Sequence, residues 1–460
     1  MMADTIVALA TPSGRSGIGV IRLSGTAPLG IVRKLVGDDF APEPRIALLR
    51  QLSDPTINET IDEALITYFK APRSFTGEDV IEISCHGSPV LLRRVIDICL
   101  SFDARIAEPG EFSLRALANG RMDLAEAEAV RDLIDAQTTA AARQAVRQMK
   151  GELSRQLQPI KDKLLDVIVT LESALEFVED DLPDVQIENT RAELAEISSE
   201  IECLASTFRI GHLIRDGLRV ALVGRPNVGK SSLFNSLLGT ERAIVTDIAG
   251  TTRDHIHERF TINAVPISLI DTAGLRETKD AVESIGVERS KAVMADADII
   301  VVMLDASEEI TREDHEILDS VGHLNYVVAL NKIDKTPSWD IDHITAAGNS
   351  QLGYIRSKIT PVSAKTREGL DDLKNAIVSP FAPEDVTSSG FLITDSRHHD
   401  LLVRASREID DSTAQFENKM SEEIVLVGLH DALRYLGEIT GETTTEDMLT
   451  RIFSTFCVGK

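Results

Sequence analysis

Cysteine, aromatic residues and positive charge are all scarce in this chain of 460 residues. The four cysteines, Cys85, Cys99, Cys203 and Cys457, form no C-x-x-C pair and no disulfide-like spacing. They therefore predict a reducing compartment and offer no zinc site. Lys and Arg number 48 against 74 Asp and Glu, which gives a formal net charge of −26. Because binding nucleic acid by bulk charge needs a basic footprint, we expect any RNA contact to be local or shared with a partner.

Long apolar runs are also missing. No stretch approaches the roughly 20 apolar residues that span a bilayer. The first residues, MMADTIVALATPSGRSG, lack the basic start and continuous apolar core of a signal peptide. We therefore expect a soluble, cytoplasmic protein. Hydrophobic residues nevertheless make up 43% of the chain and charged residues 27%, which is typical of chains that fold around cores.

The character of the sequence changes along its length and predicts three kinds of domain. Residues 1–119 mix short apolar runs with Gly and Pro, which predicts an α+β fold with several strands. Residues 120–215 are rich in helix formers, with breaks predicted at Pro159 and in the acidic stretch 179–184. Residues 216–380 alternate apolar strands with helical stretches, the rhythm of an α/β domain with a mainly parallel sheet. Residues 381–460 return to helical patterns.

Helical sequence on both sides of the α/β segment allows two arrangements. The α/β domain is inserted into one helical domain whose halves pack together, or two separate helical modules flank it. Insertion is the more economical interpretation, because each half alone would struggle to bury its apolar face.

A phosphate-binding loop is the clearest motif. Gly224-Arg-Pro-Asn-Val-Gly229-Lys230-Ser231 fits G-x-x-x-x-G-K-[ST], directly after an apolar strand and at the start of a helix. In that context backbone N–H groups and the helix N-terminus bind phosphates. Lys230 is expected at the β- and γ-phosphates, and the Ser231 hydroxyl is expected to bind Mg²⁺. The expected nucleotide contacts in the loop are Asn227, Val228, Gly229, Lys230, Ser231 and Ser232.

Companion motifs specify guanine. Asp334, in the Asn331-Lys332-Ile333-Asp334 motif, can accept hydrogen bonds from guanine N1–H and its exocyclic amine, a pair of donors that adenine lacks. Ser363-Ala364-Lys365 can offer a backbone N–H to guanine O6. Asp271, in Asp271-Thr272-Ala273-Gly274, is placed to hold Mg²⁺ through water. The order of these motifs predicts a GTPase.

A candidate switch loop and a candidate catalytic carboxylate lie between these motifs. Thr252, in Gly250-Thr251-Thr252, could complete the Mg²⁺ shell. Leu275 stands where Ras-type enzymes carry the Gln that orients the attacking water, and an apolar residue cannot do that. Glu288 is our candidate for this task; the alternative is a solvated helix carboxylate.

Asn227 allows a hypothesis about the hydrolysis reaction. Its side-chain carbonyl could bind a monovalent cation beside the phosphates, which would supply the charge that an arginine finger brings in other GTPases. The alternative is a hydrogen bond that stabilises the loop. The first interpretation predicts that hydrolysis needs K⁺.

Three regions resemble the tRNA modification GTPases of the MnmE (TrmE) family. They are RSFTGEDVIEISCHG at 73–87, PGEFSLRALANGRMDLAEAE at 109–128 and the C-terminal TRIFSTFCVGK. The resemblance spans essentially the whole chain. It implies a folate-binding N-terminal domain similar to aminomethyltransferases, a helical domain and an inserted Ras-like P-loop G domain.

The resemblance also implies a reaction and its partners. Family members act with a flavoprotein, MnmG, which uses FAD and NADH, and install an aminomethyl or carboxymethylaminomethyl group on carbon 5 of the wobble uridine of certain tRNAs. The one-carbon source is a tetrahydrofolate derivative, 5-formyl or methylene. The N-terminal domain forms a constitutive homodimer, and the G domains pair across their nucleotides in K⁺.

The resemblance also implies roles for individual residues, according to the family position that each residue matches. Ser231 and Thr252 match Mg²⁺ ligands, and Glu288 matches the glutamate that orients the water. The remaining residues of the switch loop match nucleotide contacts, namely Thr246, Asp247, Ile248, Ala249, Gly250 and Thr251. The K⁺ site of the family is matched by Asn227, Thr246, Ile248 and Thr251. Folate-binding positions are matched by Arg22, Glu82, Lys460 and Arg121. Arg121 stands where the family has Lys, and its larger, forked guanidinium makes that contact less direct.

Cys457 has two interpretations. A lone Cys is ordinarily a buried structural thiol. In the family this tail approaches the folate pocket, and its Cys has been proposed as catalytic. In the G domain, our candidate catalytic residues are Lys230 and Glu288.

Two other functions stay open on sequence grounds. One is a ribosome-assembly or RNA-binding GTPase that acts as a timer, although such proteins usually append a basic module that is not visible here. The other is a folate-dependent aminomethyltransferase with a regulatory G domain.

Overall fold

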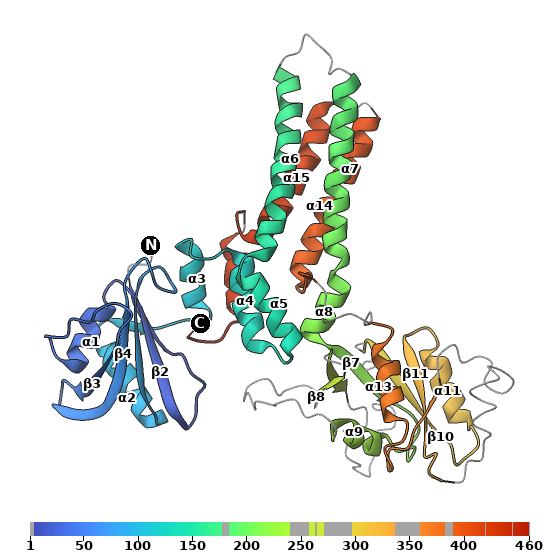
Figure 1. The fold of residues 1–460 in the computed structure, drawn as a ribbon, viewed down its shortest axis with the longest axis horizontal. Coiled ribbons are helices and arrows are strands. Elements are labelled where there is room, and N and C mark those ends of the chain that lie inside the picture. Colours follow the sequence, from blue (N-terminus) through green and yellow to red (C-terminus); the bar gives the residue numbers. More distant parts are fainter. Residues whose placement is uncertain are drawn as a thin grey trace. The chain divides into compact units, whose positions relative to one another are not determined.

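The computed structural model describes residues 4–176, 184–239, 257–262, 265–270, 297–335, 359–381, 390–418, 420–443 and 445–459. The chain divides into two compact units. Figure 1 labels their helices and strands. The first comprises Met1–Ile134, Val146–Ile197 and Arg404–Lys460, and the second comprises Asp135–Ala145 and Ser198–Val403. The predicted domain bounds at 119/120, 215/216 and 380/381 stay predictions.

The first unit begins with a six-stranded sheet in the order β3-β4-β5-β2-β1-β6. Its neighbours are antiparallel except for the parallel pair β1 and β6. The strands are β1 (Thr5–Leu9), β2 (Ser16–Gly25), β3 (Ala47–Asp54), β4 (Glu59–Phe69), β5 (Asp79–Gly87) and β6 (Ala104–Ile106). The helices α1 (Pro28–Val36) and α2 (Pro89–Ser101) both start with Pro, whose fixed φ suits the first helical position. Both helices pack on one face of the sheet.

Alternation along the strands gives the sheet two different faces. Ile21 and Leu23 of β2 are fully buried toward α1 and α2, so Arg22 between them lies on the other face. On that other face Leu49 of β3 lies directly opposite Leu65 of β4, and these side chains are 57% and 47% exposed. The predicted α+β fold of the N-terminal region is confirmed.

Helices make up the rest of the first unit. They are α3 (Glu111–Ala118), α4 (Leu124–Asp135), α6 (Glu152–Glu176), α15 (Glu422–Thr440) and α16 (Glu446–Phe453), with parts of α5 (Thr139–Met149), α7 (Asp184–Ser206) and α14 (Ser396–Glu417). Helices from before and after the α/β segment pack together. Lys161 Nζ of α6 lies 2.5 Å from Glu442 Oε1 just after α15, and Arg191 Nε of α7 lies 2.7 Å from Glu417 Oε1 of α14. This packing confirms the inserted arrangement.

Pro159 does not break a helix, so this prediction is wrong. It lies inside α6, which continues unbroken to Glu176. Pro159 itself is exposed, whereas Leu157, Ile160 and Leu164 around it are buried. Burial of that apolar face keeps the helix together even though Pro lacks the N–H for one helical hydrogen bond.

The second unit contains a mainly parallel sheet in the order β12-β11-β10-β7-β9-β8. Only the pairing of β8 with β9 is antiparallel. The strands are β7 (Leu218–Val223), β8 (His257–Ile262), β9 (Val265–Ile270), β10 (Ile299–Asp305), β11 (Tyr326–Asn331) and β12 (Ile359–Pro361), and the helices include α8 (Phe208–Asp216), α9 (Lys230–Leu238), α11 (Arg312–Val321) and α13 (Leu370–Val378). This sheet confirms the predicted α/β domain.

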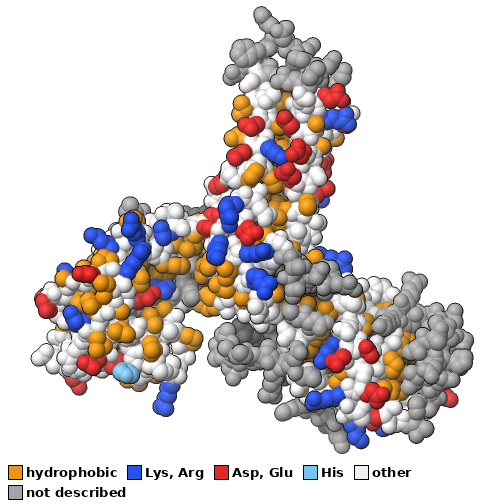
Figure 2. Space-filling model, in the orientation of Figure 1, with side chains coloured by type: hydrophobic (Ala, Val, Ile, Leu, Met, Phe, Trp, Pro, Cys, Tyr) orange, Lys and Arg blue, Asp and Glu red, His pale blue; other side chains and the backbone are white. Residues whose placement is uncertain are grey.

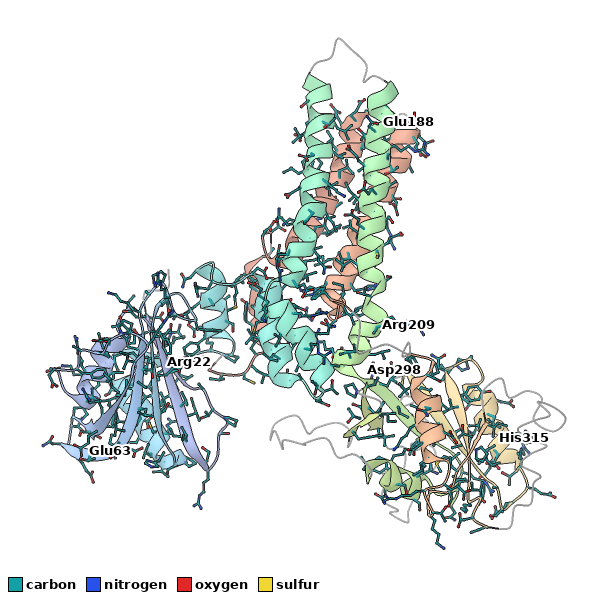
Figure 3. All side chains as sticks on the ribbon, viewed as in Figure 1. Arg22, Glu63, Glu188, Arg209, Asp298 and His315 are labelled. Carbon is teal, nitrogen blue, oxygen red and sulfur yellow. The ribbon has the colours of Figure 1, made fainter. Side chains whose placement is uncertain are left out.

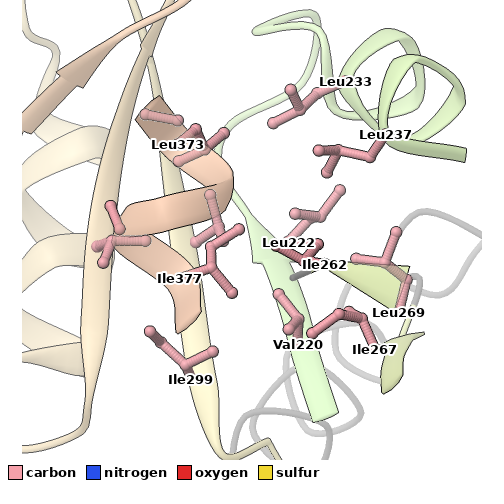
Figure 4. Packing of buried hydrophobic residues seen from close by; sticks show 14 of the residues in the cluster. Val220, Leu222, Leu233, Leu237, Ile262, Ile267, Leu269, Ile299, Leu373 and Ile377 are labelled. Carbon is pink, nitrogen blue, oxygen red and sulfur yellow. The ribbon is translucent and has the colours of Figure 1, made fainter. Parts of the chain in front are cut away.

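Helices cover both faces of this sheet. Figure 4 shows one core, in which Val220 and Leu222 of β7 pack with Leu233 of α9 and Ile377 of α13. A second cluster on the other face joins β10 and β11 to α11. Every residue of β10 is buried, as expected for a central strand of a parallel sheet. In such sheets the loops at the carboxyl ends of the strands form the binding site. Among the helices that the structure describes, none is long and apolar enough to cross a membrane.

Candidate functional site

The phosphate loop follows β7 and leads into α9. Asn227 (φ 67°) and Gly229 (φ 101°) both lie in the left-handed region. A Cβ added at Gly229 would come within 2.4 Å of Asn331 Nδ2, so the close approach of the two segments requires glycine there. The motif predicted this loop because its glycines occur where the backbone must turn tightly between strand and helix.

Lys230, the first residue of α9, reaches back over the loop. Its Nζ donates to the carbonyls of Gly224 at 2.6 Å and Arg225 at 2.9 Å. Ser231 and Ser232 follow in the exposed first turn of the helix. A phosphate group would be a stronger acceptor for this ammonium than two neutral carbonyls. The loop therefore holds a cation where the phosphates of a nucleotide are expected.

Asn331 at the end of β11 joins two of the predicted motifs. Its Nδ2 donates to the Val228 carbonyl at 2.8 Å, and its Oδ1 accepts from the Ala364 N–H at 3.0 Å. Asn331 is buried. Lys332 adds a second link, because its Nζ donates to the Asn227 carbonyl at 2.7 Å. The structure thus brings together the phosphate loop, the Asn331–Asp334 motif and Ser363-Ala364-Lys365.

Asp334 and Ser363 form the part of the site expected to bind the base. Ser363 Oγ donates to Asp334 Oδ1 at 2.7 Å and itself accepts from the Thr366 N–H at 3.1 Å. Chiefly because of the Ser363 hydrogen bond, with help from the charges of Lys365 and Lys335, the pKa of Asp334 is lowered. The Asp334 carboxylate is therefore ionised at neutral pH and exposed, as an acceptor of two base N–H groups must be.

Several predicted residues lie outside the described residues. They are the switch loop at 246–252, the Asp271–Gly274 motif at 271–274, Glu288 and Lys460. Of the expected metal ligands, Ser231 and Asn227 are described, and both are exposed at the phosphate loop. A hydroxyl and an amide carbonyl are ligands that suit Mg²⁺ and K⁺, respectively.

Arg22 and Glu82 form the candidate folate site on the N-terminal sheet. They are directly opposite each other on β2 and β5, and Arg22 Nη2 lies 2.7 Å from Glu82 Oε1. The Arg22 guanidinium also lies 5.7 Å from the ring centroids of both Phe75 and Phe112. Figure 3 labels Arg22 on this sheet. A cation, a carboxylate and two aromatic rings thus lie together on the face that α1 and α2 leave open.

The C-terminal tail reaches the same sheet. Pro109 and Val458 form an antiparallel bridge, and the Gly110 N–H donates to the Cys457 carbonyl at 3.4 Å. The Gly459 carbonyl accepts from Arg22 Nη1 at 3.5 Å. Cys457 is exposed, which contradicts its interpretation as a buried structural thiol and leaves its catalytic role a prediction. The tail is held along the sheet by its backbone, which leaves the thiol open to solvent.

Arg121 contacts this region through a loop. Its Nε donates to the Ser74 carbonyl at 3.2 Å, next to Phe75, whose ring faces Arg22. The guanidinium therefore helps to hold the loop at 74–79. Whether it also binds a ligand carboxylate stays a prediction.

A buried charge network beneath this loop was not predicted from the sequence. Arg115 of α3 is 2% exposed and donates to Glu111 Oε1 at 2.9 Å, Glu78 Oε2 at 3.1 Å and Asp4 Oδ1 at 2.7 Å. Burial alone would raise the pKa of Glu111, but hydrogen bonds from Arg105 and Arg115 lower it below its usual value. Asp4 and Glu78 lie far from Arg115 in sequence, so no local pattern signals them, whereas Glu111 lies one helical turn before it.

Comparisons with known proteins agree along the whole chain. The family model described as GTP-binding protein TrmE N-terminus matches residues 5–121, and the MnmE helical domain matches residues 124–457. The tRNA modification GTPase MnmE of Aquifex aeolicus (strain VF5) is 44% identical over 460 residues, 100% of both chains. Proteins of the same name are 42% identical in Koribacter versatilis (strain Ellin345) and 41% identical in Alkaliphilus metalliredigens (strain QYMF), each over 99% of both chains. These matches extend from end to end and coincide with the sheet, helices and nucleotide site described above, so the chain belongs to the MnmE family of tRNA modification GTPases.

Proposed function

We propose that this GTPase is stimulated by K⁺ and that, with a flavoprotein partner, it modifies carbon 5 of the wobble uridine of certain tRNAs. The added group is aminomethyl or carboxymethylaminomethyl, and its one-carbon unit comes from a tetrahydrofolate derivative. The observation that carries the GTPase part is the Asn331 side chain, which joins the phosphate loop at Val228 to the base-binding segment at Ala364.

The roles of the nucleotide-site residues follow from their chemistry. Asp334 binds the guanine N1–H and amine, and Lys230 leaves the carbonyls of Gly224 and Arg225 to pair with the phosphates. Ser231 would hold Mg²⁺, which neutralises charge on the phosphates, with Thr252 and Asp271 as further ligands. Glu288 would orient the attacking water in place of the Gln of Ras-type enzymes.

Asn227 supports the K⁺ part of the proposal. Its backbone has a positive φ and its carbonyl is held by Lys332, while its side chain is exposed beside the phosphate loop. That leaves the side-chain oxygen able to bind a cation, together with Thr246, Ile248 and Thr251. G domains of two subunits would pair across their nucleotides when this cation is bound.

The N-terminal sheet supports the folate and dimer parts. Arg22, Glu82 and the half-buried ring of Phe75 offer a stacking surface and charges for a pterin and its glutamyl carboxylates, and Arg121 and Lys460 would add positive charge. The exposed pair Leu49 and Leu65 on the same face is apolar surface that homodimer formation through this face would bury.

The tRNA and partner parts rest on family membership and on charge. Acidic and basic side chains are interspersed over the helices on the face shown in Figure 2. With the net charge of −26, this mixed surface favours a basic partner, the flavoprotein, as the main tRNA contact. The match of the N-terminal domain to a TrmE model favours this function over a ribosome-assembly timer. A cytoplasmic location is proposed for the same function.

GTP hydrolysis by the full-length protein tests the cation requirement. Rates are compared in KCl and NaCl at equal ionic strength, for the parent chain and for Asn227→Ala. The proposal predicts a rate that is higher in KCl and a loss of that difference in Asn227→Ala. Equal rates in the two salts for the parent chain contradict it.

A further inference from the structure

Arg225 connects the phosphate loop to the segment that follows β10. It is the second residue of the loop, and its Nη2 lies 2.7 Å from Glu308 Oε2 while its Nε lies 3.3 Å from Asp314 Oδ2. The Arg225 side chain is 15% exposed and that of Asp314 is 3% exposed. This ion pair therefore lies in the interior of the second unit, whereas Glu308 is at its surface.

Asp314 is fixed by the helix it begins. The Thr311 hydroxyl donates to Asp314 Oδ2 at 2.8 Å, and the Thr311 N–H donates to the same oxygen at 3.0 Å. The second of these bonds and a bond in the other direction, from the Asp314 N–H to Thr311 Oγ1 at 3.4 Å, form a capping box at the start of α11, the helix on which Figure 3 labels His315. The carboxylate that holds Arg225 is thus part of a regular helix end and cannot follow the arginine if it moves.

The backbone of Arg225 meets the phosphate-binding lysine. Its carbonyl accepts from Lys230 Nζ at 2.9 Å, while its side chain extends to α11. The last residue of β10 supports the loop a second time, because Asp305 Oδ2 lies 2.5 Å from Lys332 Nζ, which binds the Asn227 carbonyl. Both halves of the phosphate loop are therefore tied to residues 305–314.

Arg225 is a cation at every pH relevant to catalysis. Burial alone would lower the pKa of its guanidinium, but the Glu308 hydrogen bond and the charges of Asp314 and Asp305 raise it. To reach a phosphate it would have to leave a buried carboxylate without its counter-charge, which is strongly unfavourable.

We propose that Arg225 is a positioning residue of the nucleotide site: it fixes the first half of the phosphate loop against α11 and does not contact the transferred phosphate. This role differs from that of an arginine finger, which stabilises charge in the transition state and affects kcat by about 10³-fold or more. A tether of the loop acts instead on nucleotide affinity, because it keeps the loop in its binding conformation before the nucleotide arrives.

The test uses full-length Arg225→Gln, Glu308→Gln and the double variant, with Arg312→Gln as the matched control. Arg312 lies on α11 with Asp314 and pairs with Glu316 at 2.9 Å on the surface. Dissociation of a fluorescent GDP analogue and kcat at saturating GTP are measured in KCl. We expect Arg225→Gln to release GDP about tenfold faster with kcat within about twofold of the parent. We expect the double variant to equal Arg225→Gln, and Arg312→Gln to equal the parent.

Two outcomes contradict the proposal. One is a fall in kcat of about 100-fold or more with unchanged GDP release, which would make Arg225 act on the transition state. The other is GDP release at the parent rate in folded Arg225→Gln, which would show that the contacts of Arg225 with Glu308 and Asp314 do not affect nucleotide binding.

Glu308→Gln and Arg225→Lys keep the proposal testable if Arg225→Gln does not fold, since Glu308 lies at the surface and Lys keeps the buried charge. We expect GDP release to be about threefold faster in each variant. Release at the parent rate in both variants would contradict the proposal that Arg225 positions the loop.

Discussion

The side-chain amide of Asn331 donates to the carbonyl of Val228 across 2.8 Å and so connects the end of β11 to the phosphate loop. The same side chain accepts from the Ala364 N–H at 3.0 Å, so one buried residue sets the distance between the phosphate and base sites. Val228 and Ala364, which are 103 and 33 residues from Asn331 in sequence, become parts of one nucleotide site through this side chain.

Replacing Asn331 should therefore weaken both stability and nucleotide binding. In Asn331→Ala the Val228 carbonyl and the Ala364 N–H each lose a buried partner, at about 1–3 kcal/mol per group. We expect the free energy of unfolding of the G domain to fall by about 3 kcal/mol, measured by urea unfolding without nucleotide and monitored by circular dichroism. Asn325→Ala is the control, because Asn325 is exposed and contributes its backbone carbonyl to the sheet. Equal stability of the two variants would contradict this account.

Asp334→Asn should change the base that the site prefers. The variant presents an N–H where guanine presents its amine, so we expect GTP affinity to fall about 100-fold and XTP affinity to rise. Isothermal titration with both nucleotides measures this change, with Asp371→Asn on α13 as an exposed control. Because the Ser363 hydrogen bond lowers the pKa of Asp334, the parent protein should keep the same preference at pH 5 as at pH 7. Unaltered GTP binding by Asp334→Asn would place the base elsewhere.

The cysteines should divide into two reactive and two protected thiols. Burial raises the pKa of Cys85 to about 12, with a contribution from Asp62, and burial likewise raises the pKa of Cys99 to about 12. Cys203 and Cys457 are exposed. Because the thiolate is the reactive form, iodoacetamide at pH 8 should modify Cys203 and Cys457 in the folded protein. Peptide mass spectrometry identifies the sites, and modification of Cys85 before unfolding would contradict the fold of the N-terminal sheet.

An acid-sensitive ion pair joins α8, the helix that precedes β7, to the residue before α14. Arg215 of α8 lies 2.6 Å from Asp395 Oδ2. Burial alone would raise the pKa of Asp395, but the charges of His398 and Arg215 hold it well below its usual value. The stability from this group is therefore fully present above its unfolded pKa of about 4 and is lost as the pH falls through the lowered folded value.

Asp395→Asn should cost about 3 kcal/mol at pH 7, because it removes the charge of the buried carboxylate that pairs with Arg215. The difference from the parent should be the same at pH 7 and pH 5 and should shrink only in stronger acid. Urea unfolding at pH 7, 5 and 3 measures it, with Asp319→Asn as an exposed control. A difference that already shrinks between pH 7 and pH 5 would contradict the lowered pKa.

The parts of the fold that were predictable are those whose signals are local in sequence. The phosphate loop occupies consecutive residues between a strand and a helix, and Asp334 and Ser363 follow the neighbouring parallel strands β11 and β12, so their meeting at one edge could be expected. The break predicted at Pro159 was wrong because the sequence does not reveal how much apolar surface α6 buries.

Long-range polar contacts could not be predicted. Arg115 pairs with Asp4 and Glu78, and Arg225 pairs with Asp314, across separations of 37 to 111 residues. Nothing in the residue types near Arg115 or Arg225 distinguishes them from surface arginines. Only packing of distant segments decides which charges become buried, and each buried charge then needs a partner.

The most direct test of the proposed function is mass spectrometry of tRNA nucleosides from cells that lack this gene, with and without complementation. Complementing plasmids carry the parent chain, Asp334→Asn, Arg22→Ala or the control Asp371→Asn. The account predicts that the 5-substituted wobble uridine is absent without the gene, returns with the parent chain and with Asp371→Asn, and does not return with Asp334→Asn or Arg22→Ala. An unchanged nucleoside profile in cells without the gene would contradict the account.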